Sequence, residues 1–323
     1  MLTEIMDHFG LARGLRQAGY FETDHHQQLL KELEAAIRES GLVALAGMVG
    51  CGKTTLLWQL QDRLKKEGRF AIAESLAVDV DRVNLSTLKL ALFYDLATEK
   101  DGEPPTKPEK SERALVKLIL RHEKPIVLFV DDAHELHGQT LRSLKRIIER
   151  VRRRGGQLTI MLAGHPKLKN DLRRPTLEEI GARATVLELD GIKGQQKRFL
   201  LWLLQQCAQP KVKPTDMVTE EAIDLLAQCL VTPLQVEYYL TLALEHAYRF
   251  GEKTVSADVV KATMAPDINA LEPTLTRYGY NVKALSELLN VRAAEIRALL
   301  YGQLPEERAA ELKQQILKTG IPL

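Results

Sequence analysis

Cysteine is scarce in this sequence of 323 residues, which contains only Cys51, Cys207 and Cys229. Their spacing is not that of metal ligands. We therefore expect a protein of a reduced, cytoplasmic compartment, in which thiols are not oxidised to disulfides.

Long apolar runs are absent as well. No run approaches the roughly 20 residues that a membrane-spanning helix needs, so we expect no membrane partner. The first seven residues, Met-Leu-Thr-Glu-Ile-Met-Asp, carry acids and no basic stretch, which argues against a secretory signal. With 45% apolar and 27% charged residues, the composition is that of a globular protein, and the length allows two or three domains.

Net charge is small, at +2, but its distribution is uneven. Between residues 142 and 154, seven basic residues stand against one acid, Glu149, whereas the first 40 residues lean acidic. The seven are Arg142, Lys145, Arg146, Arg150, Arg152, Arg153 and Arg154. The wet face of a helix usually carries mixed charges, so this segment predicts either contact with phosphates or a charged subunit interface.

Apolar runs of strand length alternate with helical patterns between residues 42 and 189. The runs are Leu42–Ala46, Phe70–Ala73, Ile126–Val130, Leu158–Leu162 and Thr185–Leu189. The helical patterns between them are Thr54–Lys66, Leu85–Ala97, Glu112–Arg121 and Thr140–Arg153. Strands that alternate with helices predict an α/β fold with a parallel sheet covered on both faces.

Other segments mark the limits of this core. Glu99–Lys110 is charged and holds three prolines, which predicts a mobile surface loop. No further strand is expected after Leu189. We predict an α/β core with a helical N-terminal segment over 1–192, an all-helical domain over 193–264, and a small helical domain over 275–323.

Residues 47–54 read Gly-Met-Val-Gly-Cys-Gly-Lys-Thr, directly after an apolar run. Glycines let the backbone wrap so that N–H groups point at phosphate oxygens, and the following helix presents its positive end to the same anion. Lys53 would reach the β- and γ-phosphates, and the Thr54 hydroxyl would ligand Mg²⁺. This P-loop pattern predicts that the chain binds ATP and Mg²⁺. The predicted nucleotide-binding residues are Gly47, Met48, Val49, Gly50, Cys51, Gly52, Lys53, Thr54 and Thr55.

A second apolar run, Ile126–Val130, ends in two acids. A buried strand that ends in this way places a carboxylate beside the phosphate loop, where Asp131 would hold Mg²⁺ through water. Asp132 or Glu135 would orient the attacking water.

Further candidates lie beside the last two apolar runs. His165 comes just after Leu158–Leu162, where a polar side chain can sense the γ-phosphate; the alternative is a histidine that faces solvent. Arg183, just before the last run, could stabilise the transition state in a neighbouring subunit. Arg173 and Arg174 compete for that role, and each arginine has the alternative of a plain surface charge.

Together these residues resemble the AAA+ ATPases, and within them the ExeA, TniB and MuB group of transposition-associated ATPases, which is also TnsC-like. The resemblance covers about residues 20–262. The phrases that carry it are Gly47–Thr55, Val127–Leu136 (Val-Leu-Phe-Val-Asp-Asp-Ala-His-Glu-Leu), Leu162–Leu168 (Leu-Ala-Gly-His-Pro-Lys-Leu) and Val231–Gln235 (Val-Thr-Pro-Leu-Gln).

The resemblance implies a five-stranded AAA+ core, a helical lid over 193–264, and homo-oligomers, as rings or helical filaments, that form on double-stranded DNA in an ATP-dependent way. It also implies a transposase partner that the oligomer directs to target DNA. Two positions depart from the family pattern. Asp132 stands where many members have Glu, so hydrolysis is expected to be slow or to use Glu135. Pro233-Leu234-Gln235 lacks the sensor arginine of many lids.

The tail carries a second resemblance. Val282–Gly302 fits two helices around a turn at Asn290 and is similar to the helix-turn-helix of phage repressors, with Arg292 and Arg297 on the second helix. From Ala265 onward, seven basic residues balance seven acidic ones, so the tail lacks a basic footprint. A helical dock for a protein partner is therefore the alternative.

The leading hypothesis is an ATP-dependent DNA-binding ATPase that selects target DNA for a transposase. Two alternatives stay open: an AAA+ loader or remodeller that acts on a protein complex, and a secretion-associated ExeA-like ATPase. The second is disfavoured because such an ATPase is expected to carry a membrane segment and a cell-wall-binding domain.

Overall fold

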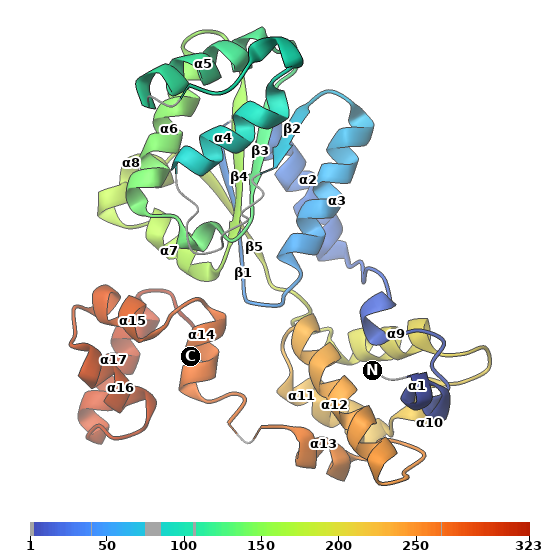
Figure 1. The fold of residues 1–323 in the computed structure, drawn as a ribbon. Coiled ribbons are helices and arrows are strands. Elements are labelled where there is room, and N and C mark those ends of the chain that lie inside the picture. Colours follow the sequence, from blue (N-terminus) through green and yellow to red (C-terminus); the bar gives the residue numbers. More distant parts are fainter. Residues whose placement is uncertain (1–2, 40, 75–84, 106–107, 266) are drawn as a thin grey trace. The chain divides into compact units, whose positions relative to one another are not determined.

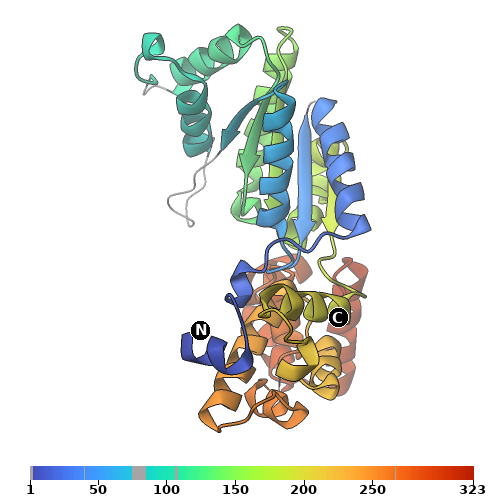
Figure 2. The same ribbon diagram turned by 90° about the vertical axis from the view of Figure 1, so that its right-hand side faces the viewer.

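The structure is a computed structural model, and it describes residues 3–39, 41–74, 85–105, 108–265 and 267–323 (Figures 1 and 2). Its contacts divide the chain into two compact units. The sheet unit comprises Asp24–Gly47 and Lys53–Leu189, and the helical unit comprises Met1–Thr23, Met48–Gly52 and Asp190–Leu323.

The sheet unit contains five parallel strands in the order β2-β3-β4-β1-β5, which confirms the predicted α/β fold. The strands are β1 (Leu42–Gly47), β2 (Ala71–Glu74), β3 (Ile126–Val130), β4 (Leu158–Gly164) and β5 (Ala184–Leu189). In register, Leu42 of β1 lies opposite Ile160 of β4, and Ile126 of β3 lies opposite Leu158. The three central strands therefore run side by side from nearly the same starting level.

The apolar character of each strand depends on whether the strand lies in the centre or at the edge of the sheet. Every residue of β1, β3 and β4 is buried, as expected for strands covered on both faces, which read as continuous apolar runs. The edge strands β2 and β5 are only partly buried, and β5 carries exposed polar residues. Helices lie on both sides of the sheet, with α2 and α3 on one side and α6 and α8 on the other (Figure 1).

The helices of this unit are α2 (Asp24–Arg38), α3 (Lys53–Glu67), α4 (Leu85–Leu96), α5 (Pro108–Arg121), α6 (Gly138–Arg152), α7 (Pro166–Leu172) and α8 (Glu178–Gly181). The helices α3, α4, α5 and α6 correspond to the four predicted patterns, whereas α7 and α8 were not predicted. Short 3₁₀ turns are η3 (Glu99–Asp101), η4 (Ala133–Glu135) and η5 (Pro175–Leu177). One apolar core, with Leu88, Leu115, Leu128 and Leu144 among its members, joins the sheet to α4, α5 and α6.

The prediction that all of Glu99–Lys110 forms a mobile loop is wrong. The turn η3 opens this segment, and α5 already begins at Pro108. Proline is well suited to the first turn of a helix, where its missing N–H is not needed. The Asp101 carboxylate also receives two hydrogen bonds, both of 2.6 Å, from the Arg121 guanidinium at the end of α5. One of the prolines, Pro108, thus starts a helix, and one of the charges, Asp101, forms a bidentate ion pair.

The helical unit contains the all-helical region expected after residue 195. Its helices are α1 (Thr3–Phe9), α9 (Gln196–Cys207), α10 (Pro214–Met217), α11 (Glu220–Cys229), α12 (Pro233–Arg249) and α13 (Ala257–Thr263), with η1 (Leu15–Gln17). Ile5 and Phe9 share one buried core with Leu203 and Leu240, so the N-terminal residues pack against the helices of 196–263. The domain limits at residues 192 and 264 stay a prediction.

The tail forms a separate cluster of four helices. These are α14 (Leu271–Arg277), α15 (Val282–Leu289), α16 (Ala293–Leu300) and α17 (Glu306–Lys318). They enclose their own apolar core, in which Leu285, Ile296 and Leu312 are fully buried. Asn290 ends α15 in the left-handed conformation, with φ 54°, at the predicted turn between the two helices of the motif.

The close packing around Gly181, at the end of α8, leads to a prediction about stability. A Cβ on this residue would lie 2.1 Å from the carbonyl oxygen of Leu172, a backbone atom that cannot move aside. We expect Gly181→Ala to lower the free energy of unfolding by about 1–3 kcal/mol, the usual cost of overpacking, as measured by denaturant titration. The control is Gly138→Ala, where the nearest atom lies 3.6 Å away, in ordinary contact. Equal stability of the two variants would contradict this account.

Candidate nucleotide-binding site

The predicted phosphate loop joins the end of β1 to the start of α3. Gly50 and Gly52 have φ angles of 75° and 100°, which glycine adopts without strain and other residues avoid. A Cβ on Gly50 would also lie 2.5 Å from the Cβ of Leu234, within the helical unit. The glycines of the motif are therefore required by the backbone path and, at Gly50, by a close neighbour.

Lys53, the first residue of α3, has a nearly buried side chain with 8% of its surface exposed. Its ammonium donates a hydrogen bond of 2.9 Å to the carbonyl oxygen of Gly47. This bond holds the ammonium beside the residue at which the phosphate loop begins. The geometry agrees with the predicted role of Lys53 at the β- and γ-phosphates.

Thr54 and Asp131, the two predicted Mg²⁺ ligands, lie in contact. The Thr54 hydroxyl donates a hydrogen bond of 2.7 Å to one carboxylate oxygen of Asp131, and the other oxygen accepts a bond of 2.9 Å from the Asp132 amide. Hydroxyl and carboxylate oxygens are the donors that Mg²⁺ prefers, so these residues fit the ion. Residues 77 positions apart in the sequence thus form one site at the carboxyl end of the sheet.

Asp132 follows in a left-handed conformation, with φ 50° and ψ 31°, and its side chain is 56% exposed. Asp and Asn adopt this region more readily than other non-glycine residues, which explains an aspartate at this turn. Its carboxylate lies 3.9 Å from Nδ1 of His134. The side chain of Glu135, the other candidate for orienting water, lies outside the described residues, so the choice between the two stays a prediction.

His165 follows β4 directly and is only partly exposed, so the alternative of a histidine that faces solvent does not hold. Its ring stacks on that of His134, with centroids 3.5 Å apart and planes inclined by 21°. Burial, together with the positive charges of His134, Lys53 and Lys167, lowers the pKa of His165 to about 3. The imidazole is therefore neutral at physiological pH. Sequence reasoning missed His134, although this residue lies in a phrase that resembles the family.

The three candidate arginines lie in different settings within the sheet unit. Arg183, just before β5, is 72% exposed, and its guanidinium lies 2.9 Å from the carboxylate of Glu149 on α6. Arg174 contacts Asp171 at 3.2 Å, and Arg173 is exposed at the end of α7. Arg183 is thus accessible but held by an exchangeable ion pair, as a group that acts on a neighbouring subunit would need to be.

At the start of α12, Gln235 belongs to the segment that lacks the sensor arginine of many lids. The side-chain oxygen of Gln235 accepts hydrogen bonds from the amides of Val231 (3.0 Å) and Thr232 (3.2 Å), while the Thr232 hydroxyl accepts one from the Gln235 amide. This is a capping box, in which both side chains satisfy backbone donors at the start of the helix. Gln235 is therefore occupied by the helix terminus.

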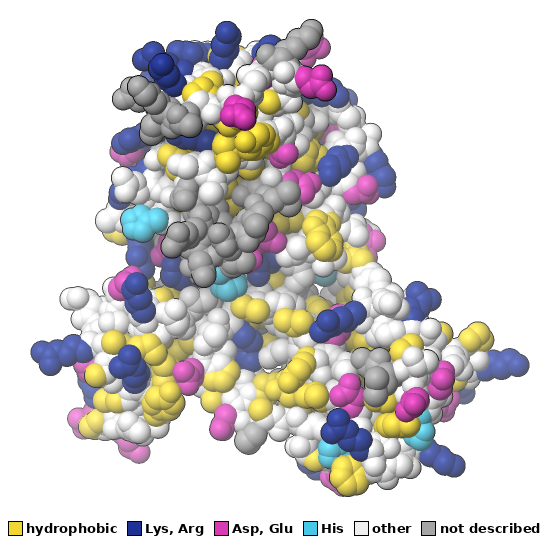
Figure 3. Space-filling view, in the orientation of Figure 1, with side chains coloured by type: hydrophobic (Ala, Val, Ile, Leu, Met, Phe, Trp, Pro, Cys, Tyr) yellow, Lys and Arg dark blue, Asp and Glu magenta, His cyan; other side chains and the backbone are white. Residues whose placement is uncertain are grey.

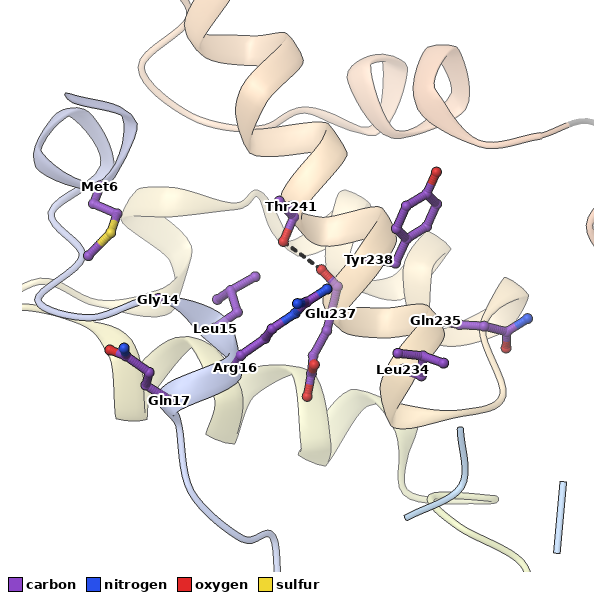
Figure 4. Close-up of a pocket in the computed structure, with 10 residues that line it drawn as sticks. All are labelled: Met6, Gly14, Leu15, Arg16, Gln17, Leu234, Gln235, Glu237, Tyr238 and Thr241. Atoms are coloured by element: carbon purple, nitrogen blue, oxygen red, sulfur yellow. Dashed lines mark hydrogen bonds between the residues drawn. The ribbon is translucent and has the colours of Figure 1, made fainter. Parts of the chain in front are cut away.

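The helical unit also contains a cavity of about 750 Å³ beside α12 (Figure 4). Its lining residues are Met6, Gly14, Leu15, Arg16, Gln17, Leu234, Gln235, Glu237, Tyr238 and Thr241. In Figure 4 the side chains of Arg16 and Glu237 extend toward the same space. Burial raises the pKa of Glu237, and the positive charge of Arg16 opposes that effect. None of the predicted site residues lines this cavity.

Comparisons with known proteins agree with this geometry. Residues 36–172 match the family model described as AAA domain, which identifies this part of the chain as an AAA domain. This segment contains the phosphate loop, Asp131 and His165. No curated protein matches the sequence.

Solved structures with a similar fold are distant in sequence. Cdc6p from Pyrobaculum aerophilum is 16% identical with a TM-score of 0.57, over 98% of this chain and 90% of that one. The Drosophila ORC bound to DNA is 14% identical with a TM-score of 0.51, over 97% and 82%. The Aeropyrum pernix ORC1 protein in complex with DNA is 15% identical with a TM-score of 0.50, over 93% and 85%. These similarities concern the fold. Among the described residues, no helix is both long and apolar enough to cross a membrane.

Removal of the Lys53 ammonium tests the assignment of the phosphate loop. We expect Lys53→Ala to weaken ATP binding by roughly 100-fold or more, the equivalent of about 2.7 kcal/mol, because the phosphate charge is then uncompensated. Calorimetry measures this directly. The matched control is Lys66→Ala, an exposed lysine of the same helix that pairs with Asp62, and it should bind ATP like the wild type. Unchanged affinity of Lys53→Ala would overturn the assignment.

Proposed function

We propose that this AAA+ ATPase binds duplex DNA as an ATP-dependent homo-oligomer and directs a partner transposase to target DNA. The observation that carries DNA binding is a basic face on α6 whose charges are only partly neutralised within the protein. Resemblance of the phrases Val127–Leu136 and Leu162–Leu168 to the ExeA, TniB and MuB group supports the transposase partner.

Four of the seven basic residues between positions 142 and 154 have partners within the protein. Arg142 donates to the carbonyl oxygen of Thr176 at 2.9 Å, Lys145 contacts Glu179 at 2.9 Å, and Arg150 pairs with Glu112. Arg152 has a partner as well. Because these side chains already have partners, they attract an external anion less strongly.

The other three, Arg146, Arg153 and Arg154, are exposed, and none makes an ion pair with a described residue. Arg146 and Arg153 are seven residues apart, so they project from the same face of the α-helix about two turns apart. Lys and Arg side chains gather at the end of the sheet unit where α6 terminates, at the top of Figure 3. Unneutralised guanidinium groups arranged in this way fit successive phosphates of a nucleic acid backbone.

Two structures of similar fold were determined with DNA, the Aeropyrum pernix ORC1 protein and the Drosophila ORC. They support the proposal that this fold can be used on DNA. The tail carries less weight, because Arg308, on α17, contacts Glu295 of α16 at 2.7 Å and the charges of the tail balance. We therefore assign nonspecific duplex binding to the ATPase core.

Neutralisation of the three unpaired arginines tests this assignment. In the variant with Arg146, Arg153 and Arg154 changed to Gln, affinity for duplex DNA should fall at every sequence. The slope of log affinity against log salt should drop by about 0.9 for each phosphate that an arginine no longer neutralises. Fluorescence anisotropy with ATP, over a range of salt concentrations, measures both quantities.

The matched control changes three basic residues of the same unit, Lys65, Lys66 and Arg69, to Gln. Each of these lies within 4 Å of a carboxylate, so the control removes the same charge from paired positions. Equal reductions of affinity in both variants would indicate a general charge effect and contradict the assignment to α6. Absence of DNA binding in a chain that ends at Met264, with normal binding by the arginine variant, would move the site to the tail.

Arg183 tests whether the site is shared between subunits. We expect Arg183→Ala to retain ATP but to hydrolyse it about 10³–10⁵-fold more slowly, the usual effect of removing an arginine that acts in trans. Mixing Arg183→Ala with Lys53→Ala subunits should restore part of the activity, because each supplies the group that the other lacks. The comparison is Arg174→Ala, which removes a competing candidate, the arginine paired with Asp171. If Arg183 has this role, Arg174→Ala should hydrolyse ATP like the wild type. Absence of recovery at every mixing ratio, with both proteins folded, would count against this role.

A further inference from the structure

The turns after β3 and β4 bring together three side chains that could share a ligand. Asp132 and His134 come from the first turn and His165 from the second. One carboxylate oxygen and one ring nitrogen from each histidine all lie within 4.8 Å of one another. We propose that Asp132, His134 and His165 bind a divalent transition-metal ion such as Zn²⁺, at a site separate from the Mg²⁺ site of Thr54 and Asp131.

Donor chemistry separates the two sites. Two imidazole nitrogens and one carboxylate oxygen suit Zn²⁺, Co²⁺ or Ni²⁺, whereas Mg²⁺ prefers oxygen ligands in near-octahedral geometry. The left-handed backbone at Asp132 assigns the two adjacent carboxylates to different partners: Asp131 contacts Thr54, and Asp132 approaches His134. Asp131 thus belongs to a group of oxygen ligands, and the adjacent Asp132 belongs to a group of nitrogen and oxygen ligands.

His165 provides a second, independent indication of a ligand. Its Nδ1 atom is buried, and no described residue makes a hydrogen bond to it. Buried polar atoms nearly always have a partner, and coordination to a metal ion would satisfy this nitrogen.

Binding requires a small, specific movement. Donors around a tetrahedral ion with bonds of about 2.0–2.1 Å are roughly 3.3 Å apart, so the three atoms must approach one another. The lone pairs of two stacked rings lie in parallel planes and do not point at a common ion. One imidazole must therefore rotate about its Cβ–Cγ bond. Both histidines lie on short turns, where such a rotation does not disturb the sheet. Three protein ligands leave the fourth position to water.

The site has a consequence for hydrolysis that rests on the proposed role of Asp132. An ion that holds the Asp132 carboxylate withdraws it from the attacking water. Zn²⁺ should then slow hydrolysis while ATP stays bound, because the phosphate loop is untouched.

Cobalt provides the direct test, since Co²⁺ bound by nitrogen and oxygen ligands has a visible spectrum. The full-length chain, without a polyhistidine tag and without nucleotide, should bind one Co²⁺ that Zn²⁺ displaces and excess Mg²⁺ does not. His134→Gln and His165→Gln should each weaken this binding by at least about 10–100-fold, because even removal of an outer-shell partner has an effect of that size. The control His25→Gln removes an exposed histidine of α2 in the same unit and should bind Co²⁺ like the wild type.

Circular dichroism shows whether the variants are folded, and loss of Co²⁺ binding in folded variants supports the site. Displacement of Co²⁺ by Mg²⁺, or wild-type Co²⁺ affinity in both histidine variants, overturns it. Hydrolysis is then measured with free Zn²⁺ set by a metal buffer, because ATP itself binds metal ions. Binding of Zn²⁺ without inhibition would leave the metal site in place and overturn the role of Asp132 in hydrolysis, which keeps the two proposals distinguishable.

Discussion

The parallel pairing of β1 with β4, and of β4 with β3, is the constraint on which the site depends. Because the three strands run in the same direction and start at matched levels, their carboxyl ends finish at one edge of the sheet. The phosphate loop, the Asp131-Asp132 pair and His165 each follow one of these strands. The register of these strands determines which polar side chains meet at that edge.

The backbone of the turn after β3 also lies close to the end of β4, where the second turn begins. A Cβ on Gly164, the last residue of β4, would lie 2.9 Å from the amide nitrogen of His134. Glycine at this position therefore lets the turn after β3 pack directly against the end of β4. That approach brings the ring of His134 onto the ring of His165. The histidine pair is thus a consequence of backbone packing, which no pattern in the sequence near either residue expresses.

Much of the sheet unit could be predicted, because its signals are local. Continuous apolar runs identify buried parallel strands, and the phosphate-loop pattern carries its own structural context. Signals that depend on distant partners were missed. The ion pair between Asp101 and Arg121 joins residues 20 positions apart, and the neutralisation of Arg150 by Glu112 depends on the packing of α5 against α6. The sequence therefore shows how many basic residues α6 carries, but it does not show which of them are unpaired.

Hydrogen-bonding capacity explains how the central residues can be held in place and still serve a ligand. The Lys53 ammonium donates a hydrogen bond to the Gly47 carbonyl oxygen, which orients the group. The Thr54 hydroxyl donates its proton to Asp131, so lone pairs on both oxygens stay available to a cation. In each case the internal bond fixes the orientation of a group that is predicted to bind phosphate or metal. A site arranged in this way loses little side-chain freedom when its ligand arrives, because the protein has already restricted that freedom on folding.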